Sequence, residues 1–229
     1  MCWHRLHYLS AALPPASNRS TINQSEWLRL KVKKVDLLII GVGGQGVVLA
    51  SDILGEVALI AGYDVKKTDT LGMAQRGGSV VSHVRIAHRV WSPLTKEGEV
   101  DILVGFEKLE AARWGYYLRP GGVAIVNNQS LPPLSVNLGD ERYPSDEEII
   151  GILKRRASRV YFVNGTERAR ELGNIRTLNI LMLGCASIFL PLKVASWKDG
   201  ICQHLPSNIR QINLLAFNWG RKEIRNAHL

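Results

Sequence analysis

One short segment has the residue types and spacing that suit backbone contact with an anion. Gly41, Gly43 and Gly46 form a G-x-G-x-x-G pattern, with Gly44 and Gln45 between them. Glycine lets the main chain turn tightly and brings its N–H groups close to a ligand. A helix that starts after such a turn adds partial positive charge. The pattern therefore favours a phosphate or another anion, although the same glycines also suit a plain strand-to-helix turn.

A second candidate is the loop that contains Gln75, Arg76, Gly77 and Gly78. Arginine supplies a rigid, permanently charged fork that suits phosphate or carboxylate. Gln75 adds an amide donor and acceptor, and the two glycines allow backbone paths that are closed to other residues. The alternative is a glycine turn with a solvated arginine, and composition alone does not separate the two.

Asn127 is a third candidate, because it directly follows the apolar run Val123–Val126. Open α/β sheets bind their ligands at the carboxyl ends of parallel strands. The glycine turn and Glu107 also follow apolar runs and fall at such ends. Asn127 suits the capping of a turn equally well.

The elements that must position these residues alternate along the chain. Leu37–Ile40 is an unbroken apolar run, as in a parallel strand buried on both faces. Apolar residues then recur at helical spacing up to Ala61, and Gly62 stands where a helix ends. Further strands are expected at 63–70, 80–86, 100–106, 123–126 and 159–163, and further helices at 107–118, from Ser145, at 164–173, 176–189, 193–203 and 207–219. The prediction is an α/β fold with an open, mostly parallel sheet and helices on both faces, in three layers.

A dinucleotide site of the ordinary NAD kind also needs an acidic residue about 20 positions after the glycines, at the end of the second strand. Asp64 stands at the start of the expected strand 63–70. Asp69 is near its end, but Thr-Leu-Gly-Met follows it rather than a helix. This mismatch counts against a self-sufficient NAD(P)-dependent dehydrogenase, which remains an alternative.

The net charge of +9 is concentrated at the N-terminus. Residues 1–34 hold six basic residues against Glu26 alone and lack a sustained hydrophobic period, so we expect a basic, disordered extension. Residues 35–229 are expected to form one domain. That body is only mildly basic and shows no RNA-binding aromatic signature or recognition-helix pattern, so nucleic acid is not an expected partner.

The apolar residues and the three cysteines limit other functions. Hydrophobic residues make up 46% of the chain, but no run approaches the roughly 20 residues of a membrane span, so no membrane contact is expected. Cys2, Cys185 and Cys202 lack the spacing of a zinc or iron–sulfur site, so no metal is expected on this chain alone. A reducing, cytoplasmic setting fits these cysteines.

Several motifs follow one another in the order of a known family. They are Gly41-Val-Gly-Gly-Gln-Gly46, Met73-Ala-Gln-Arg-Gly-Gly-Ser-Val80, Val100-Asp-Ile-Leu-Val with Phe106-Glu107 and Leu109-Glu110, Leu118-Arg-Pro-Gly-Gly-Val123, Leu172-Gly-Asn174 with Asn179, and Asn213 with Ala216-Phe217. Together they resemble the gamma-type domain of the 2-oxoacid:ferredoxin oxidoreductases, and within that family the small beta subunits that serve indolepyruvate. The resemblance runs from about residue 35 to 220.

The resemblance implies a heteromeric complex in which this chain is not catalytic alone. A large partner subunit would carry thiamine diphosphate, magnesium and iron–sulfur clusters, decarboxylate an aryl 2-oxoacid and pass electrons to ferredoxin, with coenzyme A accepting the acyl group. The gamma-type domain is associated with coenzyme A contact and with assembly. On this basis the turn at 41–46 and the loop at 75–78 are the expected ligand or subunit face, and Arg76 suits a coenzyme phosphate or an intersubunit salt bridge. Pyruvate, a branched-chain oxoacid or 2-oxoglutarate are alternative substrates, and a scaffold with an empty glycine turn is an alternative role.

Overall fold

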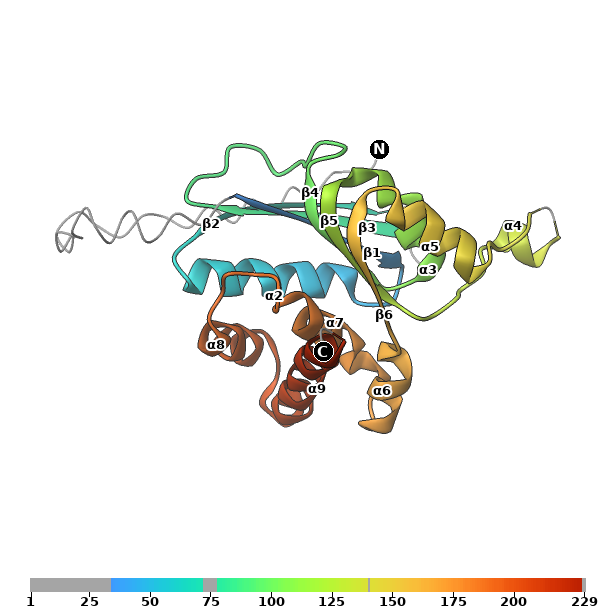
Figure 1. Cartoon of the computed structure of the whole chain (residues 1–229). Coiled ribbons are helices and arrows are strands. Elements are labelled where there is room, and N and C mark those ends of the chain that lie inside the picture. The colour runs from blue at the N-terminus through green and yellow to red at the C-terminus, as the bar shows by residue number, and fades with distance from the viewer. Residues whose placement is uncertain (1–33, 72–77, 140, 228–229) are drawn as a thin grey trace, which may run out of the picture.

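The computed structural model describes residues 34–71, 78–139 and 141–227, so most of the basic extension expected at 1–34 lies outside the described residues. The described chain forms a six-stranded sheet with the order β2-β3-β1-β4-β5-β6 (Figure 1). The strands are β1 Val35–Val42, β2 Asp64–Leu71, β3 Ser79–Ala87, β4 Val100–Gly105, β5 Leu118–Asn127 and β6 Ala157–Val163. β1, β4, β5 and β6 pair in parallel, whereas β3 lies antiparallel between β1 and β2. The predicted open, mostly parallel sheet is confirmed.

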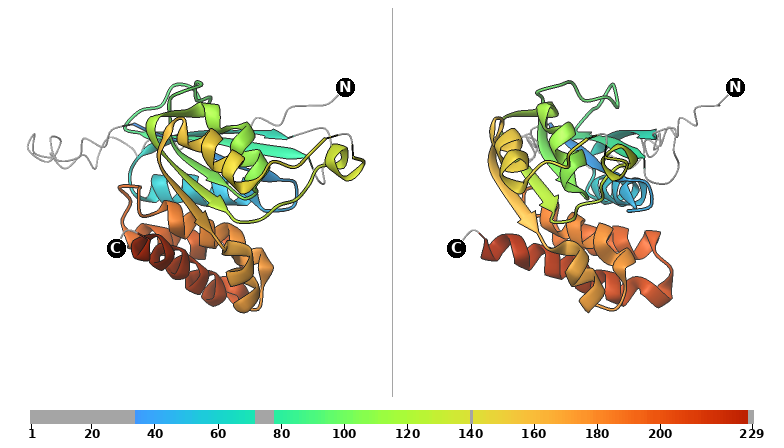
Figure 2. Two further views of the ribbon diagram at one scale, coloured as in Figure 1. Left: turned by 45° about the vertical axis from the view of Figure 1, so that its right-hand side comes forward. Right: turned by 90° about the vertical axis from the view of Figure 1, so that its right-hand side faces the viewer.

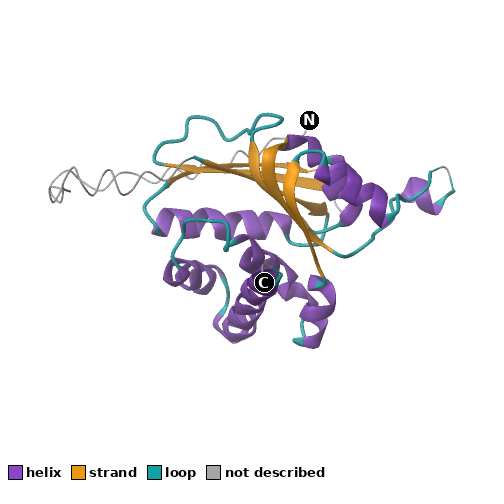
Figure 3. Cartoon of the chain, viewed as in Figure 1, coloured by secondary structure: helices purple, strands orange, loops and turns teal. Residues whose placement is uncertain are grey.

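Helices cover both faces of the sheet, as Figure 3 and the rotated views of Figure 2 show. α3 and α5 lie on one face, while α2, α7, α8 and α9 lie on the other. The helices and 3-10 turns are α2 Val47–Ile60, α3 Lys108–Arg113, η2 Gly115–Tyr117, α4 Leu134–Asn137, α5 Asp146–Lys154, α6 Gly165–Glu171, η3 Ile175–Thr177, α7 Leu178–Ala186, α8 Val194–His204 and α9 Ser207–Asn226. This arrangement gives the three layers expected from the sequence.

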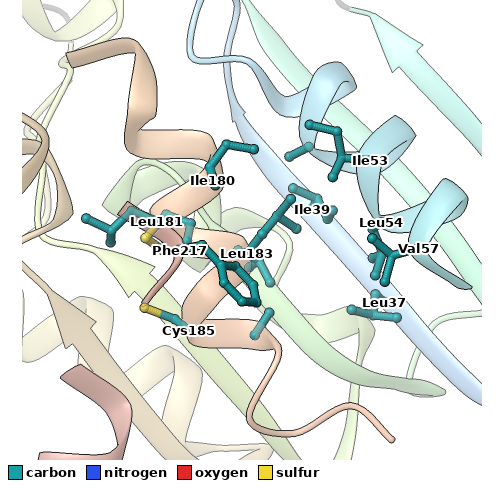
Figure 4. Packing of buried hydrophobic residues seen from close by; sticks show 14 of the residues in the cluster. Leu37, Ile39, Ile53, Leu54, Val57, Ile180, Leu181, Leu183, Cys185 and Phe217 are labelled. Atoms are coloured by element: carbon teal, nitrogen blue, oxygen red, sulfur yellow. The ribbon is translucent and has the colours of Figure 1, made fainter. Parts of the chain in front are cut away.

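Side chains that alternate along β1 enter two separate cores. Leu37 and Ile39 pack with α2, α7 and α9 (Figure 4). Leu38 and Ile40 pack on the opposite face, under α3 and α5. All four side chains are completely buried, which explains why this strand is an unbroken apolar run rather than an alternating one.

Two expected helix ends are confirmed in detail. After α2, Gly62 has a φ of 86°, and the N–H groups of Gly62 and Tyr63 donate to the carbonyls of Leu59 and Ala58. This pair of hydrogen bonds is the pattern of a Schellman motif. At α5, the Ser145 side chain and the Glu148 side chain cap each other's backbone N–H groups as a capping box.

Other boundaries differ from the expectation. The helix expected at 107–118 ends at Arg113 and continues only as the 3-10 turn η2. The segment Arg119–Gly122, expected to end that helix and to precede the next strand, belongs to β5. There the pairing with β4 shifts register and so accommodates the proline. The passage after Leu131, where the sequence predicted neither a strand nor a helix, contains the short helix α4.

Candidate functional site

The glycine turn joins the end of β1 to the start of α2. Gly44 and Gly46 have φ values of 104° and 80°, in the left-handed region that favours glycine. A Cβ atom built on Gly46 would lie 2.9 Å from Nδ2 of Asn179, a buried residue in the first turn of α7, whereas one on Gly44 would meet nothing within 4 Å. The turn therefore needs glycine for its conformation at both positions and for close packing at Gly46.

The N-terminus of α2 lacks the side-chain features that usually neutralise the positive end of a helix. Gly46 provides no side-chain cap, and the first turn of α2 contains no acidic residue. The first N–H groups of a helix have no partner inside it and carry the partial positive charge of the helix dipole. The oxygen of Ser79, which faces Val42 across the β1–β3 pair, is buried and has no hydrogen-bond partner among the described residues. These groups fit an anion such as a phosphate.

Gln45 is used inside the turn. Its side-chain oxygen accepts a hydrogen bond from the N–H of Val42 at 2.8 Å, and its side-chain nitrogen donates to the carbonyl of Phe106 at 3.1 Å. The helix after β1 packs on one face of the sheet and the helix after β4 on the other, so the two chain segments diverge here. Gln45 bridges them at the point where open α/β sheets place ligands.

Asn127 is completely buried at the end of β5. Its oxygen accepts from the N–H of Thr166 at 3.1 Å, while its nitrogen donates to Phe106 O at 3.0 Å and to Thr166 Oγ1 at 2.9 Å. Asn127 thus caps the start of α6 from a neighbouring strand, which is the capping role that the sequence left open. Its side chain has little hydrogen-bonding capacity left for a ligand, and the partner Thr166 could not be identified from spacing alone.

The second predicted loop reaches the glycine turn at its end. Gln75, Arg76 and Gly77 lie outside the described residues. Gly78 is described, and its carbonyl accepts a hydrogen bond from the N–H of Gly43 at 2.9 Å. The structure therefore brings Gly78 to the glycine turn, and a ligand-binding role for Arg76 stays a prediction.

Glu107 follows β4 at the same edge of the sheet and is 1% exposed. One carboxylate oxygen caps α3 by accepting from the N–H of Glu110 at 2.8 Å. The other accepts from the N–H of Leu131 at 3.0 Å and from the hydroxyl of Tyr143. Burial, together with the hydrogen bond to Glu107, raises the pKa of Tyr143, so its phenol stays protonated and donates. Glu107 thus holds the segment after β5 against the start of α3 through hydrogen bonds, and its carboxylate is used for structure rather than for a substrate.

The sheet order argues against an ordinary NAD site. β3 separates β1 from β2, so the end of β2 is two strand spacings, or about 10 Å, from the glycine turn. Asp69 near that end accepts a hydrogen bond from Ser82 Oγ at 2.6 Å and pairs with Lys67 at 3.0 Å. It is not free to bind the ribose of a dinucleotide.

Two kinds of site are not found in the described part of the chain. No three histidine, cysteine or acidic side chains come together there in a group able to hold a metal ion. Among the described helices, none combines the length and the apolar character needed to cross a membrane.

Comparison with known proteins identifies the family. The sequence model of a family described as pyruvate ferredoxin/flavodoxin oxidoreductase matches residues 36–223. The chain belongs to this family. The indolepyruvate oxidoreductase subunit IorB of Pyrococcus horikoshii is 36% identical over 194 residues, which cover 83% of this chain and 96% of that subunit. The IorB subunit of Methanothermobacter thermautotrophicus is 36% identical over 187 residues, or 81% of this chain and 95% of that subunit.

Solved structures have the same fold at lower sequence identity. The gamma subunit of a keto/oxoacid ferredoxin oxidoreductase from Geobacter sulfurreducens has a TM-score of 0.62 and 21% identity, with 84% of this chain and 99% of that chain covered. A 2-oxoglutarate:ferredoxin oxidoreductase from Magnetococcus marinus has a TM-score of 0.66 and 17% identity over 86% of this chain. The Magnetococcus marinus chain is longer, and the match covers only 32% of it.

Proposed function

We propose that this chain is the small, gamma-type subunit of a 2-oxoacid:ferredoxin oxidoreductase that acts on an aryl pyruvate such as indolepyruvate. The observation that carries the proposal is the nearly full-length match to IorB subunits at 35–36% identity. The common gamma subunit of the pyruvate and ketoisovalerate enzymes of Pyrococcus abyssi is 28% identical over 155 residues. The 2-oxoglutarate synthase subunit KorC is 29% identical over 199 residues. The difference in identity favours indolepyruvate over the other oxoacids.

The proposed complex assigns the redox chemistry to a larger partner subunit in the cytoplasm. That subunit would hold thiamine diphosphate, magnesium and the iron–sulfur clusters, which supply the oxidative decarboxylation and pass electrons to ferredoxin. For this chain we propose assembly and contact with coenzyme A, the acyl acceptor. Here the uncapped N-terminus of α2 would face a coenzyme phosphate, and Arg76 from the neighbouring loop would add a charged fork. Gln45 would keep the turn in shape for that contact through its bonds to Val42 and Phe106.

The first experiment is to purify the native complex through a tag on this chain. Native mass spectrometry, with iron and thiamine diphosphate assayed in the same sample, should show a large partner that bears both. Reduction of ferredoxin with a panel of 2-oxoacids should then be fastest with an aryl pyruvate. A lone chain that holds NAD(P) and lacks iron and thiamine would contradict the proposal.

The same preparation separates coenzyme contact from a scaffold role. Arg76→Ala should raise the KM for coenzyme A by about tenfold or more, because a charge-assisted contact contributes roughly 1.5–3 kcal/mol. The KM for the oxoacid should stay unchanged. Lys222→Ala, on the distant helix α9, serves as the control for loss of one positive charge. An unchanged KM for coenzyme A in the Arg76 variant would remove Arg76 from the site.

A further inference from the structure

The segment Leu131–Gly139, here called the leucine hook, presents apolar side chains to solvent. It contains α4, which stands apart from the body of the molecule at the right of Figure 1 and in the left view of Figure 2. None of the residues of α4 is buried. Leu134 and Leu138 are 71% and 68% exposed, the highest values for any leucine in the described residues, and Leu131 is 37% exposed. Leu134 and Leu138 are four positions apart, so they share one face of the helical turn.

The leucine hook is held in shape by bonds at both ends. Ser135 Oγ donates to the carboxylate of Glu141 at 2.9 Å, and the Asn137 side chain donates to the carbonyl of Pro132 at 3.2 Å. Glu107 fastens the two sides of the segment, because it accepts from both Leu131 and Tyr143. The leucines are therefore presented on a preformed element. A preformed element loses less conformational entropy on binding than a flexible loop does.

Acidic residues follow the leucine hook, on a chain that is basic overall. Residues 141–148 contain four carboxylates and one arginine, while the net charge of the chain is +9. Arg142 pairs with Glu148 at 2.7 Å, and Lys108 pairs with Asp146 at 2.5 Å. Glu141 and Glu147 are exposed and form no ion pair within the described part of the chain. The apolar tip thus stands beside a local negative charge.

The charge and the size of the leucine hook indicate which kind of partner surface it fits. Two copies of this chain that met hook to hook would bring the same acidic segments together, and like charges in an interface are costly. Three leucines also supply only a small part of the roughly 1,200–2,000 Å² that a specific interface buries. The leucine hook therefore fits the role of one anchor within a larger interface. Its leucines would sit in an apolar groove that has basic residues at its rim.

We propose that the leucine hook docks into such a groove on the larger subunit of the oxidoreductase complex. This inference rests on the proposed function, which supplies the larger subunit. The base of the hook and the glycine turn lie at the same edge of the sheet, since Leu131 bonds to Glu107 and Gln45 bonds to the adjacent Phe106. Docking at the hook therefore places the candidate anion site against the subunit that carries out the chemistry.

The test compares three versions of the full chain, each produced together with the larger subunit. They are the wild type, Leu134→Ser/Leu138→Ser, and the control Leu94→Ser/Leu215→Ser, whose leucines are 57% and 51% exposed elsewhere. Mass photometry over a dilution series gives the apparent Kd of each complex. We expect the hook variant to bind about a hundredfold more weakly, as for the loss of two buried leucine side chains. The control should bind within threefold of the wild type.

Each outcome has a distinct meaning. The hook variant should keep the circular dichroism spectrum and melting temperature of the wild-type chain, because its altered side chains are exposed. Equal affinity of the hook variant and the wild type would overturn the hook as an anchor, and so would equal weakening of both variants. A wild-type chain that forms homodimers, with dissociation of those dimers in the hook variant, would show a second copy as the occupant and overturn the proposal. A wild-type chain that associates with no larger subunit would instead contradict the proposed function itself.

Discussion

Gly46 is the position in the glycine turn where backbone conformation and packing both exclude a side chain. Its φ of 80° is unfavourable for other residues, and an added Cβ atom would lie only 2.9 Å from the amide nitrogen of Asn179. Gly44 has a similar conformation, with a φ of 104°, but open space around it. Substitutions at Gly44 and Gly46 therefore separate two contributions to the free energy of unfolding, that of the left-handed conformation and that of the contact with Asn179.

We expect Gly46→Ala to lower the free energy of unfolding by about 2–3 kcal/mol, of which about 1 kcal/mol reflects the left-handed conformation. Gly44→Ala should lose only the conformational part. Urea denaturation of both variants gives the two values, and their difference measures the contact with Asn179. Equal losses would show that α7 moves away without cost and that Asn179 does not fix the turn.

The glycines of this turn were predictable from the sequence, but the partners of its polar residues were not. The spacing of Gly41, Gly43 and Gly46 is a local pattern, and so is the helix that follows. Gln45 and Asn127 both bond to the carbonyl of Phe106, which is distant from each in sequence. Such bonds depend on which strands become neighbours, and no local pattern records that.

At the scale of elements, two glycines set the contact between α7 and α9. A Cβ atom on Gly184 would lie 2.2 Å from the carbonyl oxygen of Phe217, and one on Gly220 would lie 2.0 Å from that of Leu181. Both atoms belong to helix backbone and cannot move aside. The sequence predicted both helices from their apolar stripes, yet the close crossing appears only when they are packed together.

We therefore expect Gly184→Ala and Gly220→Ala each to destabilise the protein by about 3 kcal/mol or more, as overpacking against backbone does. The matched control is Gly151→Ala in α5, where an added Cβ meets nothing within 4 Å. That change should stabilise the protein by up to about 1 kcal/mol through helix propensity. Thermal unfolding followed by circular dichroism distinguishes the opposite signs. A neutral Gly220→Ala variant would mean that α9 is displaced easily from α7.

At the scale of the whole molecule, the layers were predictable from the sequence, whereas the strand order needed the folded structure. The apolar runs predicted buried strands, and the alternation with helices predicted a mostly parallel sheet. One local feature of the sequence bears on the placement of β3, namely the length of its connection to β2. Only the segment between Leu71 and Ser79 connects β2 to β3, and a parallel neighbour needs a crossover of a dozen or more residues. A connection this short favours antiparallel pairing, but it does not say on which side of β3 the strand β1 will lie.

The start of the domain can be placed from one ion-pair cluster. Asp36 is completely buried, and its carboxylate pairs with Lys34 at 2.8 Å and with Arg85 at 3.0 Å. Arg85 also donates to the carbonyls of Ser92 and Leu94. Lys34 thus belongs to the folded unit, one residue before the boundary expected at residue 35.

Removal of residues 1–33 should then leave the free energy of unfolding within about 0.5 kcal/mol of the full chain, as for a change outside the packed structure. The same truncation with Lys34→Ala should lose about 1 kcal/mol, a modest value because Lys34 is half exposed and screened by solvent. Urea denaturation of the three chains measures both effects. The retained Arg85 keeps Asp36 paired, so the second loss stays small. If the truncated chain failed to fold while the full chain folded, residues 1–33 would belong to the domain, and the basic N-terminus would have to be treated as part of the fold rather than as an extension.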